Sequence, residues 1–321
     1  MAINRSNPDR WKEDIAQSVD LYNSWFMDFA PKAFRETRLI TAERVKQALN
    51  ATNNLSDISI ELLKEHPEVL PILRMSTCPP IARDRLVGLV GVSKTLVESM
   101  EDSQNPRIPP RMAKKRIEND LDHISNIIEK MADPDIFVWL NRESSATDIE
   151  ISRASTIVAD RLCGAVSDPI IRNAQEKRQL TAISEWLSAR KYRYVEGIKF
   201  SEMEAGTYSF RTNVPVSMPG TGETTRVNIP VDVVIMPLEA KSGDLPLLIE
   251  AKSAGDFTNV NKRSKEEAQK MTQLKNTYGE DVHFGLFLCG YFDSGYLGYE
   301  AAEGIDWVWE HRIDDLALFR L

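Results

Sequence analysis

The stretch Leu238–Asp256, LEAKSGDLPLLIEAKSAGD, contains the tripeptide Glu-Ala-Lys twice, at Glu239–Lys241 and at Glu250–Lys252. The second copy follows the apolar run PLLI, whereas the first follows a proline and leads into a polar loop. A glutamate and a lysine two positions apart share one face of a β-strand, because strand side chains alternate between faces. Only a copy that ends a buried strand can therefore present an acid and an amine together.

The segment VNIPVDVVIM, which precedes the repeat, and the segment PLLIEAK are expected to form an antiparallel hairpin. The loop between them is centred on Lys241, so facing residue numbers sum to about 482 (twice 241), which places Asp232 opposite Glu250. Glu250 and Lys252 then share a face beside this aspartate. Glu239 and Lys241 fall inside the loop, where we expect them to be solvated.

Asp232, Glu250 and Lys252 together have the chemistry that phosphodiester hydrolysis requires. Two carboxylates on adjacent strands can ligate Mg²⁺, which prefers oxygen ligands and keeps several waters. The cation can polarise a phosphate and activate water, while the lysine ammonium stabilises developing charge or positions the attacking water. An isolated Glu-x-Lys triplet arises by chance about once in a chain of this length and usually marks a solvated strand face. The strand acid, the apolar runs and the basic segment that follows favour the catalytic interpretation.

The bulk composition excludes several other classes of protein. The 321 residues are 42% hydrophobic with a formal net charge of −8, which argues against a uniformly basic nucleic-acid binder but allows a local groove. The sequence has no run of about eighteen apolar residues and no apolar leader, so we expect a cytoplasmic protein without membrane association. Cys78, Cys163 and Cys289 lack metal or disulfide spacing and are expected to be reduced core residues.

The chain divides into two regions of different pattern. We predict a helical region over 1–145, for DNA contact or dimerisation, and an α/β catalytic domain over 146–321. The first helix is expected to stop near Pro31, because proline lacks an amide donor, and Asp168-Pro169 is expected to start a later helix. Short apolar runs after residue 190 predict three strands, one helix and two strands, which make a mixed α/β core.

The helix between the third and fourth predicted strands carries the basic segment. Ser264 is expected to cap it, with Glu267 closing a capping box and Gly279 ending the helix. Gln269, on its polar side, could orient the attacking water or a phosphate; the alternative is a surface glutamine. Basic side chains and free backbone amides at a helix start suit phosphate oxygens, as an ordinary polar loop also could. The candidates for DNA contact are Asn259, Asn261, Lys262 and Arg263.

Glu176 is a candidate for a third metal ligand. It lies on the apolar face of its predicted helix, one turn before Leu180 and two turns before Ile183, so its carboxylate is expected to face the sheet. Inward-facing carboxylates are enriched at functional sites. The alternative is a buried salt bridge.

Asp232, Glu250 and Lys252 resemble the core of the PD-(D/E)xK nucleases. The stretch from LLIEAKSAGDFTNVNKRSKEEAQKMTQLKNTYG to FGLFLCGYFDSGYLGYEAAEGIDWVWEHRIDDL is similar to type II restriction endonucleases of the XamI-like family, as is CPPIARDRLVGLVG near Cys78. One departure is the proline before the aspartate, which stands one position earlier, at Pro230. The resemblance implies a PD-(D/E)xK core, a homodimer that cuts both strands of a short palindromic DNA site with Mg²⁺, and a DNA methyltransferase in the same system.

Two other functions remain open from the sequence. The same core could belong to a structure-specific repair or recombination nuclease, which would cut branched DNA irrespective of sequence. It could also belong to a DNA-binding defence subunit without catalytic activity. The products of Mg²⁺-dependent DNA digestion separate these alternatives.

Overall fold

The chain forms two compact units, which are described in a computed structural model over residues 3–218, 225–257, 260–319 and 321; the side chains of 165–168, 218, 225 and 260–264 lie outside this description. One unit comprises Met1–Phe29 and Ile171–Leu321, and the other comprises Ala30–Ile170. The start of the chain thus joins the sheet unit, whereas we predicted one helical region over 1–145. The physical reason is local packing: Trp11 packs edge-on against Trp307, with ring centroids 5.4 Å apart.

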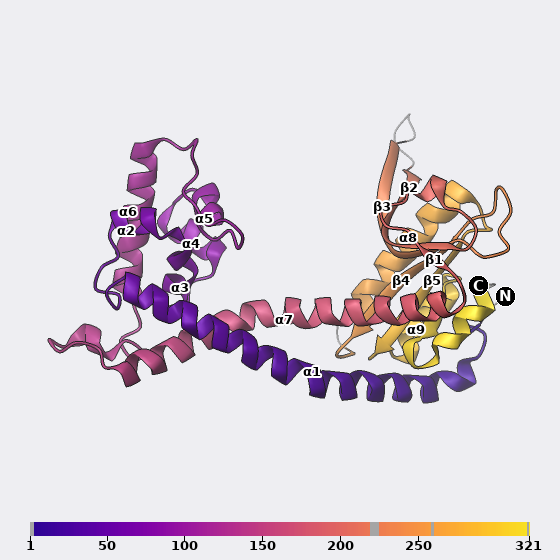
Figure 1. Cartoon of the computed structure of the whole chain (residues 1–321), viewed down its shortest axis with the longest axis horizontal. Coiled ribbons are helices and arrows are strands. Elements are labelled where there is room, and N and C mark those ends of the chain that lie inside the picture. The colour runs from indigo at the N-terminus through magenta and orange to yellow at the C-terminus, as the bar shows by residue number, and fades with distance from the viewer. Residues whose placement is uncertain (1–2, 219–224, 258–259, 320) are drawn as a thin grey trace. The chain divides into compact units, whose positions relative to one another are not determined.

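The sheet unit is built on one six-stranded mixed sheet in the order β1-β2-β3-β4-β5-β6. Figure 1 shows the sheet together with helices α8 and α9. Pairs β1–β2, β4–β5 and β5–β6 are parallel, and pairs β2–β3 and β3–β4 are antiparallel. The strands are β1 (Arg193–Tyr194), β2 (Thr207–Met218), β3 (Thr225–Ile235), β4 (Leu247–Ala254), β5 (His283–Gly290) and β6 (Asp306–Trp309). The helices that follow or interrupt them are η3 (Phe200–Glu202), α8 (Val260–Tyr278), α9 (Ser294–Ala302) and η4 (Glu310–Phe319).

Helices cover both faces of this sheet. On one face, Met271 and Leu274 of α8 and Leu297 of α9 form a buried cluster that includes Leu248 of β4. On the other face, the C-terminal part of α7 (Asp148–Ala189) packs on a cluster that includes Leu247 and Ile249. The mixed α/β prediction is confirmed, and the alternation of β4 side chains between the two clusters is as predicted.

The register of the β3–β4 hairpin confirms the predicted alignment. The paired residues are Val233 with Ile249, Val234 with Leu248 and Ile235 with Leu247, and each pair of numbers sums to 482. The backbone pairing stops at the first of these pairs. Asp232 and Glu250 come next, so they stand where the two strands begin to separate.

Strand β2 was not predicted, although its sequence TYSFRTNVPVSM alternates. It pairs with β3 along its length, except that Arg211 and Asp232 are skipped between the pairs Phe210–Val233 and Thr212–Val231. Arg211 has a φ of 51°, in the left-handed region. Tyr208 packs in the α7-side cluster, but Val214 packs in the α8-side cluster. The side chains at even-numbered positions of β2 therefore change from the α7 side to the α8 side of the sheet at Arg211, opposite Asp232.

Two long helices continue through prolines that we expected to interrupt them. Helix α1 (Pro8–Ala51) contains Pro31, and α7 contains Pro169. The predicted helix end near Pro31 and the predicted helix start at Asp168-Pro169 are therefore both wrong. A proline inside a helix removes one i→i−4 hydrogen bond but leaves the other bonds of that turn in place. Each proline lies within two residues of a boundary between the units, at Phe29/Ala30 and Ile170/Ile171.

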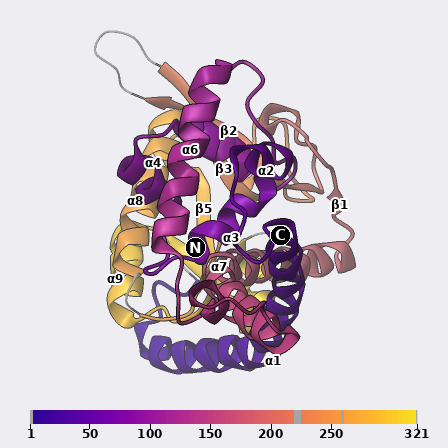
Figure 2. The same ribbon diagram turned by 90° about the vertical axis from the view of Figure 1, so that its left-hand side faces the viewer.

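The helical unit has its own apolar core, which includes Leu49, Leu73, Leu121 and Phe137. Helix α6 packs against α2 and α4 (Figure 2). The elements between α1 and α7 are α2 (Ile60–Glu65), η1 (Pro67–Val69), α3 (Leu70–Met75), α4 (Arg83–Val90), α5 (Lys94–Met100), α6 (Lys114–Met131) and η2 (Val138–Asn141). Among the described residues, no helix is long and apolar enough to cross a membrane.

The three cysteines are free thiols in different surroundings. Cys163 and Cys289 are buried, as predicted, but Cys78 is exposed, which corrects its assignment to the core. Burial raises the pKa of the Cys289 thiol to about 12. Cys289 is therefore an inert packing residue at neutral pH.

Strands β4 and β5 approach each other closely at Gly290, the last residue of β5. Its φ is +99°, and a Cβ there would lie 2.1 Å from the Ala254 carbonyl oxygen. We predict that Gly290→Ala lowers the free energy of unfolding by at least about 2 kcal/mol, because both the backbone angle and the contact become unfavourable. Urea unfolding measures the loss. The control is Gly298→Ala in α9, where no atom lies within 4 Å of the new methyl group; equal effects of the two changes would contradict the prediction.

Candidate active site

Asp232 and Glu250 are brought together where the β3–β4 ladder ends. The Asp232 carboxylate accepts a hydrogen bond from the Ala251 amide, 2.9 Å from its Oδ2, so the side chain replaces the next backbone pairing of the ladder. Burial, and then the charge of Glu250, raise the pKa of Asp232 to about 6. A pair of close carboxylates of this kind favours a bound cation, because a positive charge relieves their repulsion.

Glu250 is buried between two lysines, with 4% of its side chain exposed. The Lys252 Nζ lies 3.4 Å from Glu250 Oε2, and Lys270 of α8 pairs with Oε1. Lys270 also donates to the Pro230 carbonyl oxygen at 3.0 Å. Helix α8 therefore supplies one of the two lysines that compensate the charge of the β4 glutamate.

Lys252 is held from behind by Glu267, a residue whose position we did not foresee. Helix α8 begins at Val260 rather than Ser264, so Glu267 is not at the helix start and the predicted capping box is wrong. Its side chain is 1% exposed and lies 3.2 Å from the Lys252 Nζ. Burial lowers the pKa of Lys252, but Glu250, Glu267 and Asp232 outweigh it and raise that pKa above its usual value. The ammonium form is therefore stabilised.

Glu300 of α9 adds a second buried carboxylate behind Glu267. It is fully buried, and burial together with the charges of Glu267 and Glu303 raises its pKa to about 8. Burial also raises the pKa of Glu267, which Lys252 opposes. At neutral pH Glu300 therefore holds its proton, so that the interior does not carry another uncompensated charge beside the site.

Helix α7 contacts the site through Gln179. Its side-chain amide donates to the carbonyl oxygens of Lys252, at 3.2 Å, and of Phe287, at 3.3 Å. Gln179 is buried, so it fixes the end of β4 from the face opposite α8. Nothing in the sequence pattern marks Gln179 beyond its place in a helix of mixed polarity.

Glu176, the third predicted metal ligand, forms an ion pair with Arg211. The Arg211 Nη2 and Nε lie 2.7 and 3.0 Å from the same oxygen, Glu176 Oε1. The left-handed backbone of Arg211 costs about 1–2 kcal/mol. An ion pair as exposed as this one, with 71% of the arginine side chain accessible, contributes only about 0.2–1 kcal/mol. The ion pair alone does not account for the strained backbone.

The structure describes the remaining predicted residues to different extents. Asn259 lies outside the described residues, as do the side chains of Asn261, Lys262 and Arg263, which belong to the first turns of α8. Gln269 is exposed on that helix. Glu239 and Lys241 are exposed in the β3–β4 loop, as predicted, where the Lys241 amide donates to Asp244 at 2.7 Å.

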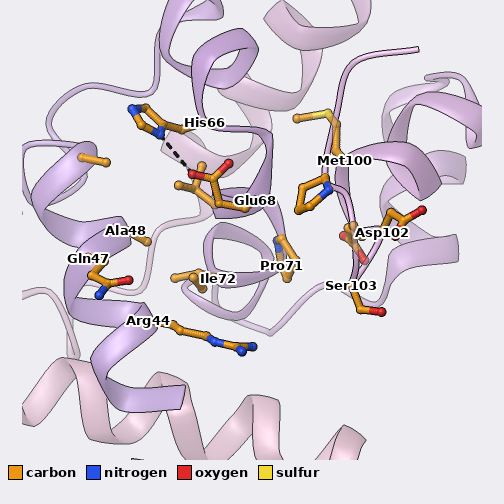
Figure 3. Close-up of a pocket in the computed structure, with 14 residues that line it drawn as sticks. Arg44, Gln47, Ala48, His66, Glu68, Pro71, Ile72, Met100, Asp102 and Ser103 are labelled. Atoms are coloured by element: carbon orange, nitrogen blue, oxygen red, sulfur yellow. Dashed lines mark hydrogen bonds and ion pairs between the residues drawn. The ribbon is translucent and has the colours of Figure 1, made fainter. Parts of the chain in front are cut away.

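The helical unit contains a cavity of its own, unrelated to these carboxylates. It has a volume of about 610 Å³ and is lined by Arg44, Met100 and Asp102 among others. His66 and Glu68 also line it, with Nδ1 and Oε1 within hydrogen-bond distance at 3.0 Å (Figure 3). Within the described part of the chain, no group of three or more His, Cys, Asp or Glu side chains is arranged to hold a metal ion.

A mixed sheet that carries two carboxylates and a lysine where two strands separate is consistent with a nuclease core. The family model described as XamI restriction endonuclease matches residues 53–309, and the chain belongs to this family. The chain is 52% identical over 317 residues to the type II restriction enzyme SalI of Streptomyces albus G, and the aligned residues make up 98% of each protein. No solved structure matches the chain. The chain is therefore a site-specific endodeoxyribonuclease, and enzymes of this class generally need a divalent metal ion.

The buried carboxyl group of Glu300 predicts a pH dependence of stability. Its pKa is about 8 in the folded protein against an ordinary value of 4.5. Between these values the folded state holds a proton that the unfolded state has lost, so stability falls as pH rises, by about 1.4 kcal/mol per pH unit. Glu300→Gln should remove this slope and stabilise the protein most near pH 8. Urea unfolding from pH 5 to 8 measures it; a parallel pH dependence of the two proteins would contradict the assignment, and the exposed Glu239→Gln serves as control.

Proposed function

We propose that Asp232, Glu250 and Lys252 form the catalytic site at which this enzyme hydrolyses a phosphodiester bond of double-stranded DNA. The observation that supports this best is the position of the three groups at the end of the β3–β4 ladder. The Lys252 ammonium is 3.4 Å from Glu250, and Asp232 carries the raised pKa of a carboxyl beside another carboxyl. Charged groups held this close below the surface stabilise little by themselves, which favours a catalytic purpose.

Mg²⁺ is the cation that we propose for this site. Asp232 and Glu250 offer oxygen ligands, and the described residues offer no additional cluster of nitrogen or sulfur ligands. Zn²⁺ sites usually need three or four protein ligands and Ca²⁺ sites six to eight oxygens, whereas Mg²⁺ keeps several waters and needs few carboxylates. When bound, the cation supplies Lewis-acid polarisation of the phosphate and activation of water. Glu176 remains a candidate ligand that would first have to release Arg211.

Lys252 acts on the negative charge that develops at the phosphate. Its raised pKa keeps the amine protonated, so it stabilises the transition state by charge and can orient the attacking water through its hydrogen bonds. Glu267 is the positioning residue for this ammonium, because it is buried behind Lys252 and cannot itself reach a DNA strand. Lys270 pairs with one carboxylate oxygen of Glu250 and so weakens the repulsion between Glu250 and Asp232. The second oxygen remains near Lys252.

We further propose that the enzyme acts as a homodimer on a short palindromic site. One active centre cuts one strand, so two centres related by a two-fold axis match a symmetric duplex. The helical unit is proposed to supply DNA contacts or the dimer contact. The α8 start, with Asn259, Asn261, Lys262 and Arg263, and Gln269 remain proposed DNA contacts. A cognate methyltransferase that protects host DNA in the cytoplasm completes the proposed system.

Digestion of a phage genome tests the function directly. Discrete fragments that require Mg²⁺ and whose ends share one sequence are expected. A smear, or cutting limited to branched DNA, would favour a repair nuclease, and no cutting in any divalent cation would favour a binding subunit. A parallel digest with SalI shows whether the two enzymes produce the same fragments.

Asp232→Ala and Lys252→Ala are expected to lower cleavage by at least about 100-fold, because each removes a group that acts on the transition state. Cleavage of a plasmid with a single site measures the rate, and circular dichroism checks folding. The matched control is Glu239→Ala in the exposed first copy of the repeat, which should cut normally. Normal cutting by Lys252→Ala would remove this lysine from the mechanism.

Glu267→Gln is expected to lower kcat about tenfold and leave KM for DNA unchanged, because the glutamate orients Lys252 without touching substrate. Loss of this carboxylate also lowers the pKa of Lys252, so the activity should decline at a lower pH on the alkaline side. A purely structural role would not move that limb. Glu266→Gln, its exposed neighbour on α8, is the control; an unchanged pH profile in Glu267→Gln would contradict the positioning role.

A further inference from the structure

Arg211 occupies an unusual position next to the proposed catalytic carboxylate. It is the non-glycine residue with left-handed backbone inside β2, and the ladder skips the pair that it would form with Asp232. Arg211 and Asp232 therefore stand at opposite positions of β2 and β3, between the pairs Phe210–Val233 and Thr212–Val231. Strained residues of this kind persist where function requires a particular side-chain direction.

The guanidinium of Arg211 has unused capacity to bind an anion. Nε and Nη2 both contact one oxygen of Glu176, and 71% of the side chain is exposed. Arginine has five donors in a planar fork, which matches phosphate oxygens, so donors remain for a ligand. The ion pair with Glu176 holds the fork near the site in the absence of substrate.

Two surface cavities share Arg211 as a lining residue, one on each side of it. One, of about 610 Å³, is lined by Asn173, Lys177 and Thr181 of α7, with the acidic Glu185 also on its wall. The other, of about 360 Å³, is lined by Lys199, Asn213 and Asn228, and the described residues around it include no acidic side chain. Both are open at the surface of the sheet unit, and Phe210 and Arg211 line both of them.

We propose that Arg211 binds a backbone phosphate beside the scissile one, and that the two surface cavities follow the DNA strand on either side of it. This inference rests on the proposed function, because it takes the strand at Asp232 to be the one that is cut. Lysines and amide side chains along a groove are typical donors to phosphate oxygens. The guanidinium of Arg211, on its left-handed backbone, is held by Glu176 of α7 at 2.7 Å, and the phosphate would replace this carboxylate.

Arg211→Gly separates this role from a structural one. Glycine adopts a positive φ without strain, so the variant should unfold at the same or a higher urea concentration than the parent. DNA binding should nevertheless weaken about tenfold, for all duplex sequences alike, because a phosphate contact has been lost. In EDTA, which prevents cutting, the slope of log K against log salt between about 50 and 200 mM should fall by about 0.9.

Arg193→Gly on β1 is the matched control, since Arg193 is also exposed and pairs with Glu204 at 2.9 Å. It should leave both affinity and salt slope unchanged. The proposal is overturned if Arg211→Gly binds DNA as the parent does, or if it loses affinity only together with stability. These results leave cleavage by the unmodified enzyme as an independent readout, so failure of the proposed function appears as absence of cutting and not as a change in the Arg211 variant.

Discussion

The compensation of one buried carboxylate, that of Glu250, organises the proposed active side of this protein. Glu250 sits in a position that is 4% exposed, where an unpaired negative charge would be strongly unfavourable. Lys252 comes from its own strand and Lys270 from the helix that follows. Without Lys270, Glu250 would share its remaining lysine, Lys252, with the buried Glu267, so the position of helix α8 on strand β4 matters for the charge balance. The packing of Leu274 and Met271 beneath the sheet holds that register.

The hairpin could be predicted from the sequence because its information is local. Alternation along PLLIEAK determines which side chains share a face, and the length of the loop around Lys241 determines the register, which the structure confirms at three pairs. The same local alternation is present in β2, where Tyr208 and Phe210 are followed by Val214 and Val216. That strand was missed because polar residues and Pro215 interrupt the pattern, and because the two halves of the strand pack on opposite faces.

The contacts that come from distant elements could not be predicted in the same way. Ser264 and Glu267 have the spacing of a capping box, but the helix starts four residues earlier, at Val260. Glu267 lies inside the helix and contacts Lys252. Local spacing cannot distinguish these outcomes, because the helix start depends on how α8 docks against β2 and α9. Pro31 and Pro169 mislead for a related reason: each removes one hydrogen bond, while the helix continues on both sides of it.

The site also coincides with the place where regular sheet structure fails. The β3–β4 pairing ends at Val233–Ile249, the β2–β3 pairing skips Arg211–Asp232, and the faces of the β2–β3 ribbon exchange at the same level. A regular ladder would have directed the Ala251 amide to a backbone carbonyl, and instead it binds the Asp232 carboxylate. Separation of the strands thus lets a side-chain carboxylate take a backbone donor and brings the charged side chains of both strands together. A nuclease needs both, because a phosphate must approach the carboxylates closely, and an unbroken β-sheet offers no such opening.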